Sequence, residues 1–177
     1  MADSVPSRPA LTVPLPTARL VLRAVQPDDD PMLTRIWTDP DVRRYMGGPL
    51  SSEVVRHRNG DFVGKPGKYC VTLRATLEPI GLLGIGRDHR SGHLEVSYGL
   101  LPEHWRRGYA QEAILALLAW AFERLPDADV IVANTRADNA PSRQLLQAIG
   151  AECVESFGEG DESVMYAMAR RQFLTPP

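Results

Sequence analysis

The spacing of apolar residues predicts strands and helices from the start of the chain. Leu20 to Val25 has the two-residue period of a strand, and Gln26-Pro27 ends it. The acidic run Asp28–Asp30 then precedes apolar residues at helical spacing, which predicts a helix that ends at Asp39-Pro40. The expected buried face of that helix is Met32, Leu33, Ile36 and Trp37. A second, short helix is expected over about Ser51 to His57.

The middle of the chain has the strongest strand signal. Tyr69 to Ala75 and Ile80 to Gly86 flank the Glu78-Pro79 turn and predict an antiparallel hairpin. His93 to Leu101 follows as a third strand, with one apolar face and one face of small and polar side chains. The apolar face consists of Leu94, Val96, Tyr98 and Leu100, and the other face of Glu95, Ser97, Gly99 and Leu101.

The remaining elements decide the fold class. They are expected to be a helix from about Ala110 to Pro126, a strand over Val130 to Asn134, a helix between Asn139 and Gly150, and strands over Ala151 to Glu155 and Ser163 to Ala169. This order predicts an α+β fold with a mostly antiparallel sheet of about six to seven strands flanked by helices. One strand-helix-strand unit, from His93 to Asn134, interrupts the antiparallel order.

Length and composition favour a single globular domain. The chain has 177 residues, of which 44% are hydrophobic and 24% are charged, an ordinary composition for a globular protein. We expect residues 1–16, which are rich in proline, to form an extended lead-in to a domain over residues 17–177. The formal net charge of −2 provides no field that would attract polyanions, so nucleic acid is not an expected partner.

Neither a membrane nor a metal is expected as a partner. The longest apolar run, Ala113 to Phe122, is about half of the roughly 20 residues that a spanning helix needs. No signal-peptide pattern opens the chain, so a cytoplasmic location is expected. Cys70 and Cys153 lack metal-ligand spacing and are expected to be reduced core residues. A homodimer is compatible with these features.

The segment before the longest helix is the first candidate for chemistry. Arg106 to Ala110 leads into a helix N-terminus, where unpaired backbone N–H groups and the helix dipole favour phosphate oxygens. Gly108 allows a positive φ or the close approach of a ligand, and Arg106 and Arg107 add positive charge. Taken alone, a glycine between a strand and a helix is most often a plain turn.

Several motifs along the chain match one protein family. Thr17 to Arg23 looks like its opening strand, and Asp39 to Val42 with Tyr45 to Pro49 looks like the exit of its first helix. The signature Q/R-x-x-G-x-G/A falls on Trp105 to Ala110, and the motif D-N-x-x-S-x falls on Asp138 to Arg143. Over about residues 17–170 the chain therefore resembles the GNAT superfamily of acetyl-CoA-dependent N-acetyltransferases, in particular the ribosomal-protein alanine N-acetyltransferase branch.

Three residues depart from that family pattern. Trp105 replaces the Gln or Arg of the signature, a replacement that this branch commonly shows. Ser97 stands where the branch often has Gly, and Ala151 stands where it usually has Phe. Both of the latter changes could alter packing only, or they could reshape the acceptor pocket.

The resemblance implies a GNAT-like fold with a strand-loop-helix-strand unit that binds acetyl-CoA as a co-substrate, without a metal. The pyrophosphate is implied to lie on the backbone of Arg106, Arg107, Gly108, Tyr109 and Ala110. Pantetheine is implied to run along Leu100 and Leu101 toward Asn134, Asn139 and Ser142. In such proteins the strands beside this groove splay apart, which frees backbone N–H groups for the thioester oxygen.

Acetyl transfer to an amine needs a neutral amine, a stabilised oxyanion and a proton for the departing thiolate. Ser142 is the candidate acid by its place in the family motif, and helix-start chemistry explains a serine there about as well. Tyr98 and Tyr109 are reserve acids, although Tyr98 is most simply a core residue. Glu95 is the candidate base or amine-orienting group, with a solvated strand face as the alternative.

Acidic residues late in the chain bear on the acceptor. They are Glu152, Glu155, Glu159, Asp161 and Glu162. Their local field favours a small cationic amine, such as an amino-sugar or an aminoglycoside, and a solvated acidic loop is the alternative. Two other functions stay open, namely acetylation of a protein N-terminal α-amine and a non-catalytic coenzyme A-binding module.

Overall fold

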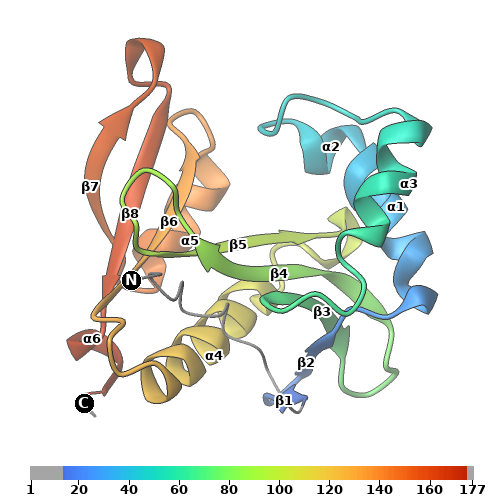
Figure 1. Cartoon of the computed structure of the whole chain (residues 1–177), viewed down its shortest axis with the longest axis horizontal. Helices are drawn as coiled ribbons and strands as arrows, with labels where there is room; N and C mark the ends of the chain where they lie inside the picture. The colour runs from blue at the N-terminus through green and yellow to red at the C-terminus, as the bar shows by residue number, and fades with distance from the viewer. Residues whose placement is uncertain (1–13, 175–177) are drawn as a thin grey trace, which may run out of the picture.

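The computed structural model describes residues 14–174, in which an eight-stranded sheet carries helices on both faces (Figure 1). The strands are β1 (Leu15–Pro16), β2 (Leu20–Ala24), β3 (Lys68–Leu73), β4 (Pro79–Arg87), β5 (Leu94–Leu100), β6 (Val130–Arg136), β7 (Glu152–Phe157) and β8 (Ser163–Ala169). Across the sheet they lie in the order β1-β2-β3-β4-β5-β6-β8-β7. Only β5 and β6 are parallel neighbours. The predicted α+β class with one parallel step is confirmed.

Two groups of helices cover opposite faces of the sheet. The α-helices are α1 (Asp30–Thr38), α2 (Pro40–Arg43), α3 (Ser52–Gly60), α4 (Tyr109–Arg124), α5 (Ala140–Ala148) and α6 (Arg171–Leu174). Short 3-10 helices occupy Pro27–Asp29, Pro102–His104 and Glu159–Asp161. In Figure 1, α4 lies below β3 to β5, whereas α1, α2 and α3 stand above them at one end. No helix within residues 14–174 is both long and apolar enough to cross a membrane.

Each helix group has its own core. The larger core packs α4 against β2 to β6, and its Leu117 and Phe122 are completely buried. The smaller core packs α1 and α3 against the other face of the sheet, where it includes Leu82 of β4. All four apolar residues predicted to line α1 are buried in this smaller core. The two faces predicted for β5 are also separated, because Leu100 lies in the larger core and Leu101, just after β5, in the smaller one.

Local sequence signals explain where α2 begins, although the sequence pattern did not predict that helix. Asp39 and Pro40 end α1, as expected, and they also start α2. The Asp39 carboxylate accepts hydrogen bonds from the N–H groups of Asp41 at 2.9 Å and Val42 at 3.1 Å. This is an N-cap with proline in the first helical position, so the same dipeptide that breaks one helix stabilises the next.

The sheet is larger than the pattern of strands predicted. Leu15 and Pro16, at the end of the expected lead-in, pair with β2 as an eighth strand, and residues 1–13 lie outside the described part. The prediction that both cysteines lie in the core is half wrong. Cys70 on β3 is buried, but Cys153 on β7 is exposed, because β7 is the edge strand and its residues are almost all exposed.

A partly buried ion pair fixes the junction between β2 and α1. The Asp29 carboxylate accepts two hydrogen bonds of 2.7 Å from the Arg23 guanidinium and one of 2.8 Å from the Gln26 N–H. Burial alone would raise the pKa of Asp29, but these donors outweigh burial and hold the pKa below its ordinary value. The ionised carboxylate therefore stabilises the folded state.

We expect Asp29→Asn to destabilise the protein by about 2 kcal/mol, because the substitution leaves the Arg23 guanidinium without its charged partner. The stabilisation by Asp29 is present above its unfolded-state pKa and is lost as the pH falls through the lower folded-state pKa. Urea unfolding of wild type and variant at neutral and acidic pH measures this difference. The difference in free energy of unfolding between wild type and variant should shrink on acidification. A difference that stays constant with pH would contradict the role of the ion pair.

Candidate active site

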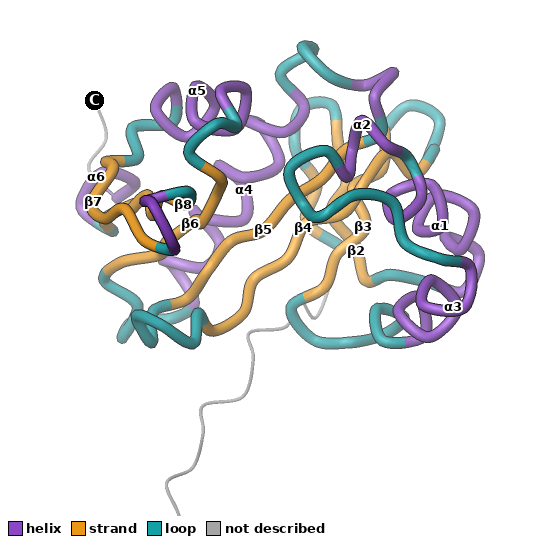
Figure 2. Tube along the Cα trace, turned by 90° about the horizontal axis from the view of Figure 1, so that it is seen from above, coloured by secondary structure: helices purple, strands orange, loops and turns teal. Residues whose placement is uncertain are grey.

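The strands β5 and β6 pair over only two positions and then separate. The parallel register joins Leu94 to Ile131 and Glu95 to Val132, and no pairing between the two strands follows. On its other side β5 stays paired with β4 along its whole length. The separation can be followed in Figure 2, where the two strands diverge toward the loop that precedes α4. The facing edges of β5 and β6 are therefore unpaired beyond Glu95 and Val132, and this gap in the strand pairing is the opening in the sheet.

The loop before α4 presents backbone amides at the end of β5. Arg106 and Gly108 have φ values of 58° and 77°, so two left-handed residues precede the helix. The Trp105 indole N–H anchors the loop by donating to the Leu100 carbonyl at 2.7 Å. Within residues 14–174, the N–H groups of Arg107, Gly108, Tyr109 and Ala110 have no hydrogen-bond acceptor. Such a cluster of amides at a helix N-terminus is suited to bind an anion.

Gly108 is required by backbone conformation. It is the N-cap residue of α4 in the left-handed region, and a Cβ added to it would meet only the Arg19 Nη2 atom, at 3.2 Å. The positive φ that the sequence allowed is therefore present. The neighbouring side chain that limits this position is Arg19, from the segment before β2, a contact that the local sequence does not signal.

Glu95 lies on the face of β5 that carries small residues, as predicted. Its register partner on β4 is Gly86, and Gly84 lies opposite Ser97, so few side chains cover this part of the sheet. The Asn134 amide of β6 donates to the Glu95 carboxylate at 3.1 Å and to the Asp88 carboxylate at 3.4 Å. One amide thus joins two carboxylates. Nothing in the local sequence singles out Asp88 as a partner of Glu95.

The two carboxylates differ in proton affinity. Burial raises the pKa of Glu95, the nearby Asp88 charge raises it further, and the Asn134 donor opposes both effects. For Asp88, burial alone would raise the pKa, but the N–H and hydroxyl of Ser91, at 2.8 and 2.6 Å, hold it below its ordinary value. Asp88 is therefore the fixed charge of the pair, and Glu95 is the group more readily protonated.

Ser142 of α5 and Tyr98 of β5 come together and join the two elements. Their hydroxyl oxygens are 2.7 Å apart. The Ser142 N–H donates to the Asn139 side-chain oxygen at 3.2 Å, so Asn139 is the N-cap of α5. Burial raises the pKa of Tyr98, and the hydrogen bond with Ser142 opposes that shift. Tyr98 is thus partly a core residue, as its strand face indicated, with its hydroxyl directed to the candidate acid.

The other predicted site residues differ in what they can offer a ligand. The side chains of Leu100 and Leu101 are buried in the two cores, so only their backbone can line the opening. Arg106 and Arg107 are exposed beside the loop amides. The Asn134 side-chain oxygen is buried and has no hydrogen-bond partner among the described residues. No group of three or more His, Cys, Asp or Glu suited to a metal occurs within residues 14–174.

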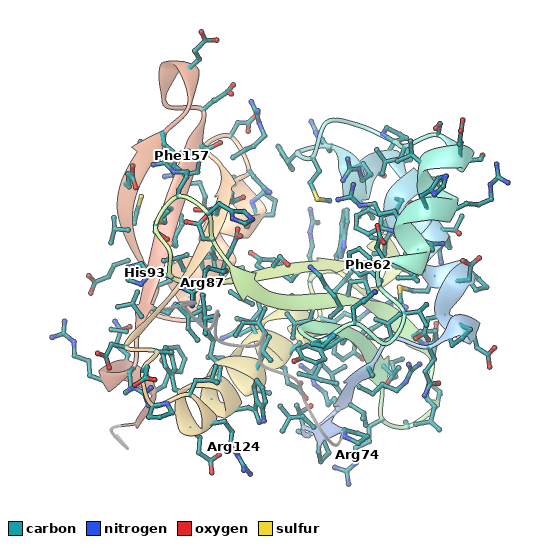
Figure 3. All side chains as sticks on the ribbon, in the orientation of Figure 1. Phe62, Arg74, Arg87, His93, Arg124 and Phe157 are labelled. Atoms are coloured by element: carbon teal, nitrogen blue, oxygen red, sulfur yellow. The ribbon has the colours of Figure 1, made fainter. Side chains whose placement is uncertain are left out.

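The late acidic residues lie on the arm that β7 and β8 form beside the opening (Figure 1). Glu155 pairs with Arg90, whose guanidinium also lies 4.2 Å from the ring centroid of Phe157, labelled in Figure 3. Glu162 lies 3.7 Å from Arg136. Glu152 and Glu159 are exposed and have no ion pair within the described residues. Part of the acidic charge is therefore neutralised locally.

Comparisons with known proteins agree on one family. The model of the acetyltransferase (GNAT) domain matches residues 19–152. The N-acetyltransferase p20 of Bacillus licheniformis, itself uncharacterized, is 30% identical over 141 residues, which cover 75% of this chain and 79% of that relative. The solved GNAT-family acetyltransferase from Bacillus anthracis has a TM-score of 0.79 at 22% identity, covering 90% of this chain and 99% of that one.

A further solved structure was determined with bound ligands. The spermidine N-acetyltransferase from Vibrio cholerae, in complex with CoA and spermine, has a TM-score of 0.71 at 16% identity. The match covers 90% of this chain and 100% of that chain. At this level of identity the similarity shows a common fold.

We expect Asn134→Leu to raise the pKa of Glu95 further, because the substitution removes the amide donor that favours the ionised carboxylate. Carbon-13 NMR titration of the glutamate carboxyls measures this pKa directly. Ser97→Ala, on the same face of β5, is the matched control and should leave the pKa of Glu95 unchanged. An unchanged or lowered pKa in Asn134→Leu would show that the Asn134 hydrogen bond does not set the proton affinity of Glu95.

Proposed function

The chain belongs to the GNAT family of acetyl-CoA-dependent N-acetyltransferases, and we propose that it transfers an acetyl group directly to the primary amine of a small cationic acceptor. The observation that carries the assignment of the site is the row of loop amides at the end of β5, which have no acceptor within residues 14–174 and lie beyond the stretch where β5 pairs with β6. This arrangement is suited to hold a diphosphate at one end of an opening that continues between the two strands.

The residues present fit acetyl-CoA. The N–H groups of Arg107, Gly108, Tyr109 and Ala110 would bind the pyrophosphate, and the exposed side chains of Arg106 and Arg107 would add charge. The buried, unpartnered oxygen of Asn134 is an acceptor for an amide N–H of the pantetheine arm. When bound, acetyl-CoA supplies an acyl group already activated as a thioester.

Glu95 is proposed to take the proton from the amine. Its raised pKa makes it a stronger base than an ordinary carboxylate, and Asp88 beside it adds negative charge that favours an approaching ammonium group. An α-amine with a pKa of about 8 needs less help than a lysine amine at about 10.4. Because Glu95 acts in its ionised form, activity should fall as the pH drops through its pKa.

Ser142 and Tyr98 are proposed to supply the proton to the departing thiolate as a pair. Their hydroxyls are hydrogen-bonded, so a proton leaving Ser142 can be replaced from Tyr98. The cap of α5 uses the backbone N–H of Ser142 and not its hydroxyl, which bonds to Tyr98 instead. The two sequence interpretations of Ser142, a helix-start residue and an acid, are therefore compatible.

The carboxylates near the proposed site support a small cationic acceptor. The Asn134 amide holds Glu95 and Asp88 close together, and the exposed Glu152 and Glu159 lie on the β7–β8 arm. An amino-sugar or an aminoglycoside has the amines that such carboxylates attract. The spermidine N-acetyltransferase, solved with spermine, is an example of this fold with a polyamine.

Thiol release from acetyl-CoA with a panel of amines tests the function. We expect turnover with an amino-sugar, an aminoglycoside or a polyamine. The rate of turnover should fall at least about tenfold in Glu95→Gln, and the wild-type rate should fall on acidification.

The acceptor class is tested by removing charge from the β7–β8 arm. Glu152→Gln combined with Glu159→Gln should raise KM for the amine but not for acetyl-CoA, and added salt should do the same. Turnover confined to peptide α-amines would favour the protein N-terminal alternative, and binding of coenzyme A without any turnover would favour the non-catalytic module.

We expect Ser142→Ala and Tyr98→Phe each to lower kcat by at least about tenfold with little change in coenzyme A affinity, since a proton donor to the thiolate acts in the transition state. The double variant should be no slower than the worse single variant if the two hydroxyls act as one unit. Gln147→Ala, exposed on α5, is the matched control. Full turnover in both single variants would place the proton donor elsewhere, with Tyr109 the next candidate.

A further inference from the structure

A segment far from α4 in the chain is bound to its first turn. The Glu112 carboxylate accepts hydrogen bonds from the Thr17 hydroxyl at 2.5 Å, the Arg19 N–H at 2.7 Å and the Arg19 Nε at 2.7 Å. Glu112 is 93 residues from Arg19 in the chain. Burial alone would raise the pKa of Glu112, but these donors outweigh burial and hold it below its ordinary value. Glu112 is therefore a charged anchor for Arg19.

Arg19, held in this way, lies against Arg107 and Gly108 of the loop before α4 and against Tyr109, the first residue of α4. Its Nη1 donates to the Arg107 carbonyl at 2.9 Å, and its Cζ lies 4.7 Å from the ring centroid of Tyr109. Its Nη2 lies 3.2 Å from the point that a Cβ on Gly108 would occupy. The planar guanidinium thus supports one side of the loop.

The geometry of the peptide bond between Arg107 and Gly108 determines which way the Gly108 N–H points. In a trans peptide the C=O and N–H groups point in opposite directions. Because Arg19 holds the Arg107 carbonyl, the N–H of Gly108 in the same peptide unit points away from Arg19. The loop also contains Arg106 at a φ of 58°, which is unfavourable for a residue with a side chain. External contacts are needed to keep such a loop in one conformation.

We propose that Arg19, anchored by Glu112, is a positioning residue for the acetyl-CoA site. It fixes the Arg107–Gly108 peptide so that its N–H faces the pyrophosphate before the co-substrate arrives. The inference rests on the proposed binding site at this loop. It assigns a role to the Thr17-Ala18-Arg19 segment, which acts through the loop and not on the reacting atoms.

Titration calorimetry with coenzyme A and steady-state kinetics with acetyl-CoA test this role. In Arg19→Ala we expect the Kd for coenzyme A and the KM for acetyl-CoA to rise about tenfold, while kcat at saturation changes less than about twofold. Arg19→Lys should restore part of the affinity, because an ammonium group can replace one contact but not the whole planar fork. Glu112→Gln should also raise the Kd for coenzyme A, and adding it to Arg19→Ala should raise this Kd little further.

Arg74→Ala is the matched control. The Arg74 guanidinium donates to the Thr17 carbonyl at 3.2 Å, so it holds the same segment without touching the loop; Arg74 is labelled in Figure 3. This variant should bind coenzyme A like the wild type. Thermal unfolding without ligand verifies that each variant is folded, and Arg19→Lys provides the test if Arg19→Ala does not fold.

Three outcomes would overturn the proposal in different ways. Wild-type Kd in a folded Arg19→Ala variant would show that the loop does not need the guanidinium. An equal loss of affinity in Arg74→Ala would show that docking of the segment, and not the Arg19 contact with the loop, supports binding. Absence of coenzyme A binding by the wild type would refute the proposed function itself, and the positioning role with it.

Discussion

The short pairing of β5 with β6 is the constraint on which the rest of the site depends. Within residues 14–174 these two strands are the only parallel neighbours. The chain between them therefore has to return from the end of β5 to the level at which β5 began, and α4 makes this crossing. The helix therefore begins beside the end of β5, where the strands have already separated. The amides of its first turn and the opening in the sheet are two consequences of the same connection.

The polar groups beside the opening are organised by pairs rather than by single residues. Asn134 joins Glu95 to Asp88, and Ser142 is joined to Tyr98. In the first pair, the donors of the Ser91 turn keep Asp88 ionised, which leaves the easier protonation to Glu95. Proton affinity at each position is therefore a property of the packing between elements, and it cannot be assigned from residue type.

Local sequence signals were sufficient for much of the fold. The four apolar residues of α1, the Asn139 cap of α5 and the two faces of β5 depend on interactions within one element, and all were predictable from period and cap chemistry. A prediction failed where the burial of a residue depended on the neighbouring elements of the fold. Cys153 looks like a core residue in sequence, but it is exposed because β7 is the edge of the sheet.

The sequence by itself determined the α+β class and the single strand-helix-strand step, since these follow from the hydrophobic period of each element and from the order of the elements. Only the tertiary structure decided which residues meet. The period of β5 shows which face Tyr98 occupies, but its contact with Ser142 joins residues 44 apart. In the same way, Gly108 signals a left-handed turn, whereas the position of the Arg19 side chain, which would meet a Cβ on Gly108, depends on how β2 and α4 pack together. The side-chain pattern of an element predicts which face a residue occupies, but only the packing of the elements shows which residue it contacts.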